Sequence, residues 1–178
     1  QNTDKSAIEP EEVKAIVADL KSDFDYILLD CPAGIEQGFA NSVAGADEAI
    51  VVSTPEISAV RDADRVVGLL EQADLDEPPM LIINRIKKRM VNDGTMMDVD
   101  EITHHLSIKL IGIVFDDDEV IGTSNKGEPI VLNEKSPASK GYRNIARRLE
   151  GQTVPLMTLK ESDESGFFGK IASWFQKK

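Results

Sequence analysis

The sequence has little of several residue classes, and each shortage narrows what the protein can be. Its single cysteine, Cys31, allows no disulfide within the chain, as is typical of proteins in a reducing compartment. Basic residues are few, 20 Lys and Arg against 32 Asp and Glu, which gives a formal net charge of −12. Because binding to phosphate backbones needs a basic surface, nucleic acid is not expected to be the main partner.

Longer sequence signals are missing too. No apolar run reaches the roughly 18 residues of a membrane-spanning helix. The first residues, QNTDKSAIEP, contain neither an initiator Met nor a signal peptide, so we expect the chain to be part of a longer protein. Neither GxxxxGK[ST] nor GxGxxG occurs. A nucleotide hydrolase containing this chain would therefore need its phosphate-binding loop elsewhere.

The hydrophobic residues, 41% of the chain, predict alternating strands and helices. Short solid apolar runs, typical of strands buried on both faces, occur at 26–30, 48–55, 80–85 and 109–115. Stretches with helical spacing occur at 10–24, 57–73, 98–106 and 136–151. This order predicts an α/β fold with a parallel, doubly wound sheet flanked by helices. We expect it to span residues 1–151, followed by a polar connector, 152–164, and a separate C-terminal helix, 165–178.

Ligands of open parallel sheets bind beyond the carboxyl ends of the strands, so the residues after each strand are the candidate site. Asp30 follows the first expected strand, where a carboxylate can hold Mg²⁺ or a metal-bound water, or simply cap the next turn. The loop after it, with Pro32 and Gly34, can contact a terminal phosphate through backbone N–H groups.

Two further polar groups follow later strands. Asn84 and Arg85 can pair with and stack on a purine base, or form an ordinary polar pair at a strand end. The acids of FDDDEV suit a loop at the edge of a base better than a metal site, because acids are also favoured at a helix start. On the 57–73 helix, Asp62 and Asp64 form either a solvated face or a surface that docks a partner.

The last fourteen residues differ from the rest of the chain. They carry three lysines and no acid, which leaves the other 164 residues at −12 − 3 = −15. On a helical wheel the large apolar side chains share an arc of about 160°, as in an interfacial membrane helix. The alternative is a helix packed on its own domain. The predicted lipid-binding residues are Phe167, Phe168, Lys170, Ile171, Trp174, Phe175, Lys177 and Lys178.

Several segments, in order, resemble the ParA/MinD-type family of deviant Walker-motif ATPases, and in particular its septum-positioning members. The resemblance covers nearly the whole chain and implies that a KGGVGKT phosphate loop precedes it, so that this chain alone is inactive as an ATPase. The segments that carry it are FDYILLDCPAGIEQG, ADEAIVVSTPEISAVRDADRVVGLL, IINRI, DDDEVI, SNKGEPIVL and YRNIARRLEG.

The resemblance also implies roles for individual residues and a set of ligands. ATP and Mg²⁺ are the implied cofactors, with Asp30 as the switch carboxylate that supports Mg²⁺ and water activation. It further implies an ATP-bound homodimer, cytoplasmic and reversibly bound to anionic lipids of the inner membrane face. Asp62 and Asp64 would face the division inhibitor MinC and a topological regulator of the MinE or DivIVA/MinJ type. The switch loop would be Pro32, Ala33 and Gly34, and the adenine contacts Asn84, Arg85, Asp116, Asp117 and Asp118.

Two alternatives remain open from the sequence. The chain could be a non-enzymatic module that docks to membrane and partners, or it could belong to a related ParA-type or flagellar-number-regulating ATPase.

Overall fold

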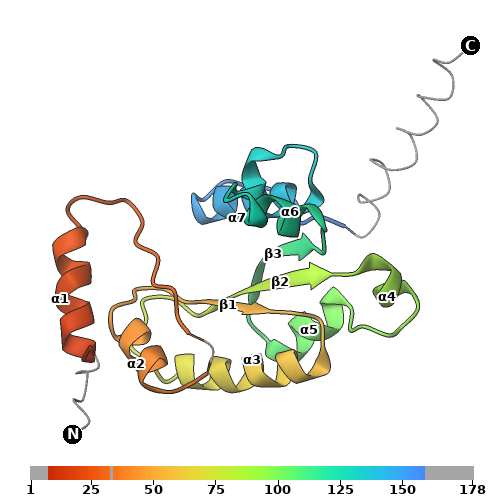
Figure 1. Cartoon of the computed structure of the whole chain (residues 1–178). Helices are drawn as coiled ribbons and strands as arrows, with labels where there is room; N and C mark the ends of the chain where they lie inside the picture. The colour runs from red at the N-terminus through yellow and green to blue at the C-terminus, as the bar shows by residue number, and fades with distance from the viewer. Residues whose placement is uncertain (1–7, 33, 159–178) are drawn as a thin grey trace, which may run out of the picture. The chain divides into compact units, whose positions relative to one another are not determined.

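The computed structural model describes residues 8–32 and 34–158. The chain divides into two compact units, Gln1–Ile50 with Arg65–Pro79 and Val51–Asp64 with Met80–Lys178, and each is described by itself. Figure 1 labels the elements. In chain order they are α1 (Pro10–Leu20), α2 (Gln37–Ala44), β1 (Ile50–Ser53), α3 (Ile57–Leu70), β2 (Met80–Ile86), α4 (Lys88–Asn92), α5 (Val99–Leu106), β3 (Lys109–Phe115), α6 (Glu119–Asn125), the 3-10 helix η1 (Ile130–Leu132) and α7 (Pro137–Leu149).

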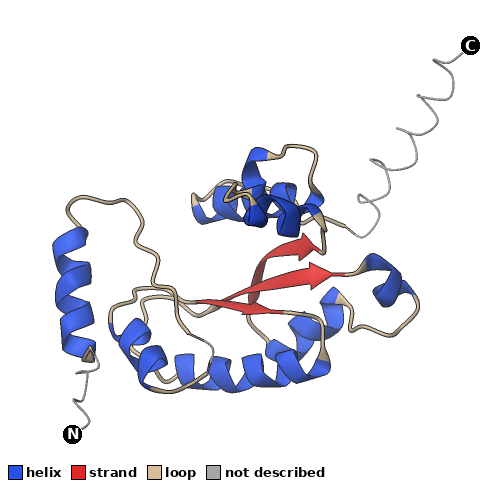
Figure 2. Cartoon of the chain, in the orientation of Figure 1, coloured by secondary structure: helices blue, strands red, loops and turns tan. Residues whose placement is uncertain are grey.

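The sheet has the strand order β1-β2-β3, and β2 and β3 run parallel from the pair Met80 and Lys109 to the pair Ile86 and Phe115 (Figure 2). The three later apolar runs of the sequence therefore form strands, as predicted. Parallel strands need crossover connections, and α4 and α5 lie between β2 and β3 in the chain. The predicted fold class, a parallel sheet flanked by helices, is confirmed.

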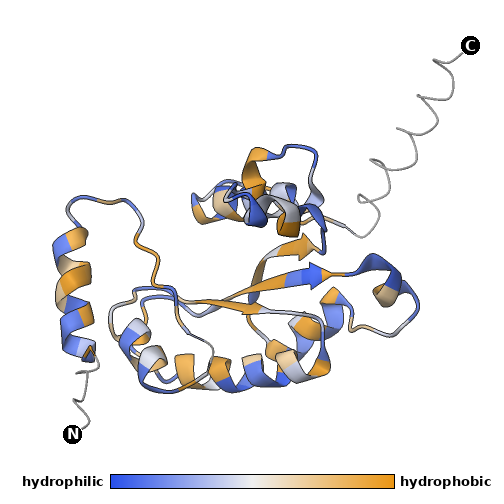
Figure 3. Ribbon diagram, viewed as in Figure 1, coloured by the Kyte–Doolittle hydropathy of each residue, from blue (hydrophilic) through white to orange (hydrophobic). Residues whose placement is uncertain are grey.

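Both faces of the sheet are packed against helices, and Figure 3 shows the apolar strands between them. On one face, α7 covers a buried cluster of Ile111, Val114, Ala138 and Ile145, against which Met80 and Ile82 also pack. Because side chains alternate along a strand, Leu81 and Ile83 of β2 point to the opposite face, and both are 0% exposed. The helix α5 lies on that side of β2 and β3, with Ile102 and Leu106 buried (Figure 1).

Two glycines allow α7 to approach β3 closely. A Cβ atom at Gly141 would lie 2.9 Å from the Ile113 carbonyl oxygen and 3.3 Å from Val114 Cα. A Cβ atom at Gly112 would lie 2.2 Å from Ile145 Cγ1. At both positions the missing side chain therefore sets the distance between helix and strand.

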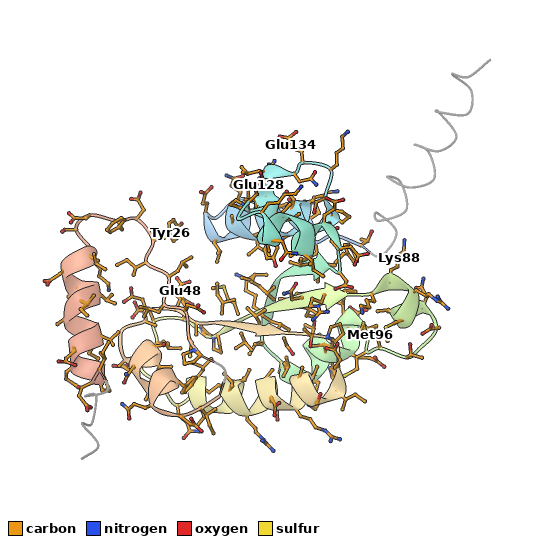
Figure 4. The ribbon with its side chains drawn as sticks, in the orientation of Figure 1. Tyr26, Glu48, Lys88, Met96, Glu128 and Glu134 are labelled. Carbon is orange, nitrogen blue, oxygen red and sulfur yellow. The ribbon has the colours of Figure 1, made fainter. Side chains whose placement is uncertain are left out.

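The strand predicted at residues 26–30 is wrong. The segment is extended but belongs to no strand, and the described sheet consists of β1, β2 and β3. Leu28 is 87% exposed, and Tyr26, labelled in Figure 4, is 62% exposed. A strand buried on both faces needs neighbouring strands for its backbone groups and helices for its side chains. The described sheet supplies no neighbouring strand for residues 26–30, so the apolar run alone does not make this segment a strand.

The chain after α7 is held to β3 by Arg148. Its Nε donates to the Val154 carbonyl at 2.9 Å, Nη1 to the Ile111 carbonyl at 2.8 Å, and Nη2 to the Pro155 carbonyl at 2.6 Å. Burial lowers the pKa of the Arg148 guanidinium below its usual value. Met157, two residues further on, is buried. The first part of the expected connector is thus packed on its unit, which its polar sequence did not indicate.

The predicted amphipathic helix at 165–178 lies outside the described residues. Among the residues that the structure describes, no helix combines the length and apolar character needed to cross a membrane. The division into a domain, a connector and a C-terminal helix stays a prediction.

Candidate functional site

The carboxyl end of β2 carries a local irregularity at Asn84 and Arg85. The pairing of β2 with β3 shifts register between Ile83 and Ile86. Arg85 adopts a φ of 58°, a left-handed conformation that costs a non-glycine residue on the order of 1–3 kcal/mol. Its backbone N–H donates to Asn84 Oδ1 at 2.9 Å, so the Asn84 side chain supports this conformation. Such bulges redirect side chains and are over-represented next to active sites.

The neighbouring strand supplies the partner of Arg85. Asp116 follows β3 directly, and its backbone N–H donates to the Ile86 carbonyl at 3.0 Å, which continues the pairing with β2. Its carboxylate lies 3.2 Å from Arg85 Nε and 3.6 Å from Lys87 Nζ. Since Arg85 is exposed, we expect these ion pairs to fix geometry more than they stabilise the fold.

The other two acids of the loop point elsewhere. Asp117 Oδ2 accepts a hydrogen bond from Ser136 Oγ at 2.6 Å, at the start of α7. Asp118 is the N-cap residue of α6, is exposed, and makes no side-chain capping bond. The three acids therefore do not converge on one point. Among the described residues, no group of three His, Cys, Asp or Glu side chains could hold a metal ion.

Asp30 belongs to the first unit, and its surroundings are described within that unit. It is exposed and lies in extended coil after the 26–29 segment, not at the end of a strand. Gly34 follows with a φ of 111°, a value open to glycine but strained for other residues. The Pro32 ring lies so close to α2 that a Cβ atom at Gly38 would come within 2.5 Å of it. Ala33 lies outside the described residues.

Asp62 and Asp64 are both exposed on α3, whose buried side includes Val60 and Ala63. At about 100° per residue the two acids diverge by about 200° around the helix. A partner protein that contacts both acids must therefore extend around the exposed side of α3. Whether Asp62 and Asp64 bind a partner stays a prediction.

Three features of this region escaped the sequence analysis: the left-handed backbone of Arg85, the participation of Lys87, and the role of Ser136. Only the last had a visible signal, because a serine followed by proline is a common helix start. Ser136 is indeed the N-cap of α7, and its hydroxyl accepts the Ser139 N–H. Its second partner, Asp117, lies 19 positions earlier. Figure 4 shows Lys88 at α4, and Glu128 and Glu134 between α6 and α7.

Comparison with known proteins gives several matches. A family model described as cellulose biosynthesis protein BcsQ matches residues 1–145. The septum site-determining protein MinD of Bacillus subtilis (strain 168) is 58% identical over 175 residues, which cover 98% of this chain. The chain spans 65% of the length of that relative.

Solved structures agree with the sequence matches. The MinD cell division protein of Aquifex aeolicus has a TM-score of 0.80 at 45% identity, covering 85% of this chain and 64% of its own. The MinC:MinD cell division protein complex from the same organism matches with the same TM-score and identity, covering 85% of this chain and 63% of the matched one. A structure of the cell division ATPase MinD from Pyrococcus furiosus has a TM-score of 0.70 at 25% identity, covering 80% of this chain and 58% of its own.

Proposed function

We propose that the chain is part of an ATPase that positions the division septum. It belongs to the family whose model is described as cellulose biosynthesis protein BcsQ, and its relatives by sequence and by structure include MinD proteins. The observation that carries the proposal is the Asn84–Arg85 bulge at the ligand edge of the sheet. There Asn84 Oδ1 accepts the backbone N–H of the strained Arg85, and Asp116 pairs with the Arg85 side chain. Strain of this kind clusters at functional sites, and it lies here where open α/β sheets bind ligands.

In this proposal the bulge binds the adenine of ATP. Asn84 offers an amide that donates and accepts, although its Oδ1 already accepts one bond, and Arg85 offers a planar cation. These groups fit a purine, which presents a π-face and a polar edge. Asp116, Asp117 and Asp118 form the loop on the other side of the base.

At the phosphate end, Asp30 supports Mg²⁺ directly or through water, and Pro32, Ala33 and Gly34 form the switch loop. One exposed carboxylate suits Mg²⁺, which usually keeps several waters and takes its other ligands from substrate phosphates. The ion would assist attack of water on the terminal phosphate when bound.

Membrane binding is assigned to residues 165–178. Each large apolar side chain contributes at most about 1.5–3 kcal/mol, and each lysine about 1 kcal/mol near anionic lipid. Ordering costs roughly 1–2 kcal/mol per residue, so a single tail binds weakly. Two tails on an ATP-bound homodimer gain an effective concentration factor of about 10²–10⁴. Binding to the inner face of the cell membrane then follows the nucleotide state.

A vesicle experiment tests this proposal. With the full-length protein, co-sedimentation with anionic vesicles should require ATP, and binding that is equal in ADP would contradict the proposal. Phe168→Glu and Trp174→Glu should each release the protein from the vesicles. Ile121→Glu is the matched control, because it places the same charge at an exposed apolar position of α6 and should leave binding unchanged.

Partner binding is assigned to Asp62 and Asp64, with MinC and a topological regulator of the MinE or DivIVA/MinJ type as the partners. The MinC:MinD complex among the similar structures supports the MinC part of this assignment. Asp62→Ala with Asp64→Ala should weaken capture of MinC by the full-length protein without changing vesicle binding. Unchanged capture would remove this surface from the proposal.

A second candidate concerns the 178-residue chain by itself. Its sequence contains no GxxxxGK[ST] segment, so we propose that it acts alone only as a docking module for membrane and partners. Measurable ATP turnover by this chain would contradict that. A ParA-type role on DNA is disfavoured by the net charge of −12, and a gel shift with duplex DNA tests it.

A further inference from the structure

A continuous path of hydrogen bonds joins the loop after β3 to the start of α7. We propose that Asp117 and Ser136, here called the latch, position the loop that contacts the nucleotide base. Asp117 is then a positioning residue that acts through its neighbour Asp116 and does not touch the ligand. The inference rests on the proposed function and corrects the simplest form of it, in which all three acids of the loop face the base.

On the α7 side, the latch is built from buried groups. Ser136 is 3% exposed, and its hydroxyl donates to Asp117 Oδ2 at 2.6 Å while accepting the Ser139 backbone N–H at 3.0 Å. The Ala138 N–H lies 3.5 Å from the same carboxylate oxygen. The carboxylate therefore sits at the N-terminus of a helix, where the helix dipole favours negative charge.

The support beneath the latch is the close packing of α7 on β3. The close approach at Gly141 fixes α7 against β3. Ser139, 0% exposed, donates its own hydroxyl to the Val131 carbonyl at 3.2 Å, away from the loop. The Ser139 hydroxyl bond is therefore separate from the latch, and the position of Ser136 is set by the packing of α7 on β3 at Gly141.

On the loop side, two neighbouring carboxylates bond to different elements: Asp116 to the end of β2 and Asp117 to the start of α7. Asp116 bonds to Arg85 and Lys87 at the end of β2, whereas Asp117 bonds to Ser136 and, through Oδ1, accepts the Glu119 N–H at 3.0 Å. The latch therefore limits where Asp116 can lie. Since Asp116 in turn pairs with the Arg85 guanidinium, loss of the latch frees both side chains that would border the base.

The test is steady-state ATP hydrolysis by the full-length protein. Ser136→Ala and Asp117→Ala should each raise KM for ATP about tenfold, the effect of losing one hydrogen bond to a charged group. The kcat should change less than about twofold, because the proposed phosphate contacts, Asp30 and its switch loop, are other residues. Ser136→Thr keeps the hydroxyl, so its KM for ATP should equal that of the protein without substitutions. In the double variant the two effects should not add, because both remove the same bond.

Ser139→Ala is the matched control. It removes a buried hydroxyl from the same turn of α7 but leaves the latch intact, so it should lower stability without raising KM. If Ser136→Ala lowers stability while KM stays unchanged, the latch is only a helix cap and the inference is overturned. If the unchanged protein neither binds nor hydrolyses ATP, the proposed function itself fails, and this outcome is distinct from the first.

Discussion

Replacing Gly141 with alanine tests how closely α7 packs on β3. The new Cβ atom would lie 2.9 Å from the Ile113 carbonyl oxygen, whereas ordinary contacts begin at 3.4 Å. The helix or the strand must therefore move by at least 3.4 − 2.9 = 0.5 Å. Overpacking of this kind costs about 1–3 kcal/mol. It opposes a gain of about 1 kcal/mol, because alanine is the better helix former.

We expect Gly141→Ala to lower the free energy of unfolding by about 1 kcal/mol. The backbone oxygen cannot rotate away as a flexible side chain could. Gly122→Ala in α6 is the control, because its Cβ atom would meet nothing within 4 Å. It should raise the free energy of unfolding by up to about 1 kcal/mol. The difference between the two variants isolates the cost of the overlap.

Urea unfolding followed by circular dichroism measures both variants, with unchanged m values showing that the denatured state is comparable. Equal stabilisation by the two alanines would refute the reasoning. It would mean that α7 lies further from β3 than the structure places it, and that the support beneath the latch is loose.

Two further predictions concern other parts of the chain. Arg148→Met should lower stability by about 2–4 kcal/mol and speed amide hydrogen exchange at residues 154–157, because three carbonyls lose a charged donor, here called the Arg148 clamp. Arg147→Met, at an exposed position, is the control. Unchanged exchange in the Arg148 variant would contradict the clamp. Leu28→Ser should change stability by less than about 0.5 kcal/mol, whereas Leu81→Ala should cost about 2–5 kcal/mol; a large cost at Leu28 would mean that residues 26–30 form a buried strand after all.

The fold was predictable where a strand and the helices that pack on it lie close together in the sequence. The runs that became β1, β2 and β3 are solid, apolar and followed by helices of clear periodicity. Residues 26–30 have the same pattern, yet they form no strand. An apolar run favours a buried strand, but the strand forms only where neighbouring strands pair with it, and the described sheet supplies none for residues 26–30.

The position of Asn84, Arg85 and Asp116 was predictable but their internal pairing was not, and Asp30 does not follow a strand as predicted. Asn84, Arg85 and Asp116 lie at the expected edge because strand ends meet there in any parallel sheet. The positive φ of Arg85 carries no sequence signal, since left-handed positions usually attract glycine or asparagine. The bond between Asp117 and Ser136 joins different elements, so no local spacing reveals it.

The clamp at Arg148 has a mechanical consequence for the proposed membrane anchor. Met157 is buried, and 165 − 157 − 1 = 7 residues separate it from the start of the predicted anchor. Fully stretched, the eight Cα–Cα steps from Met157 to position 165 span at most about 28 Å. A membrane anchor joined by so short a connector would keep its unit close to the lipid and restrict which side of that unit faces the bilayer. The clamp would thus give the anchored protein an orientation as well as a location.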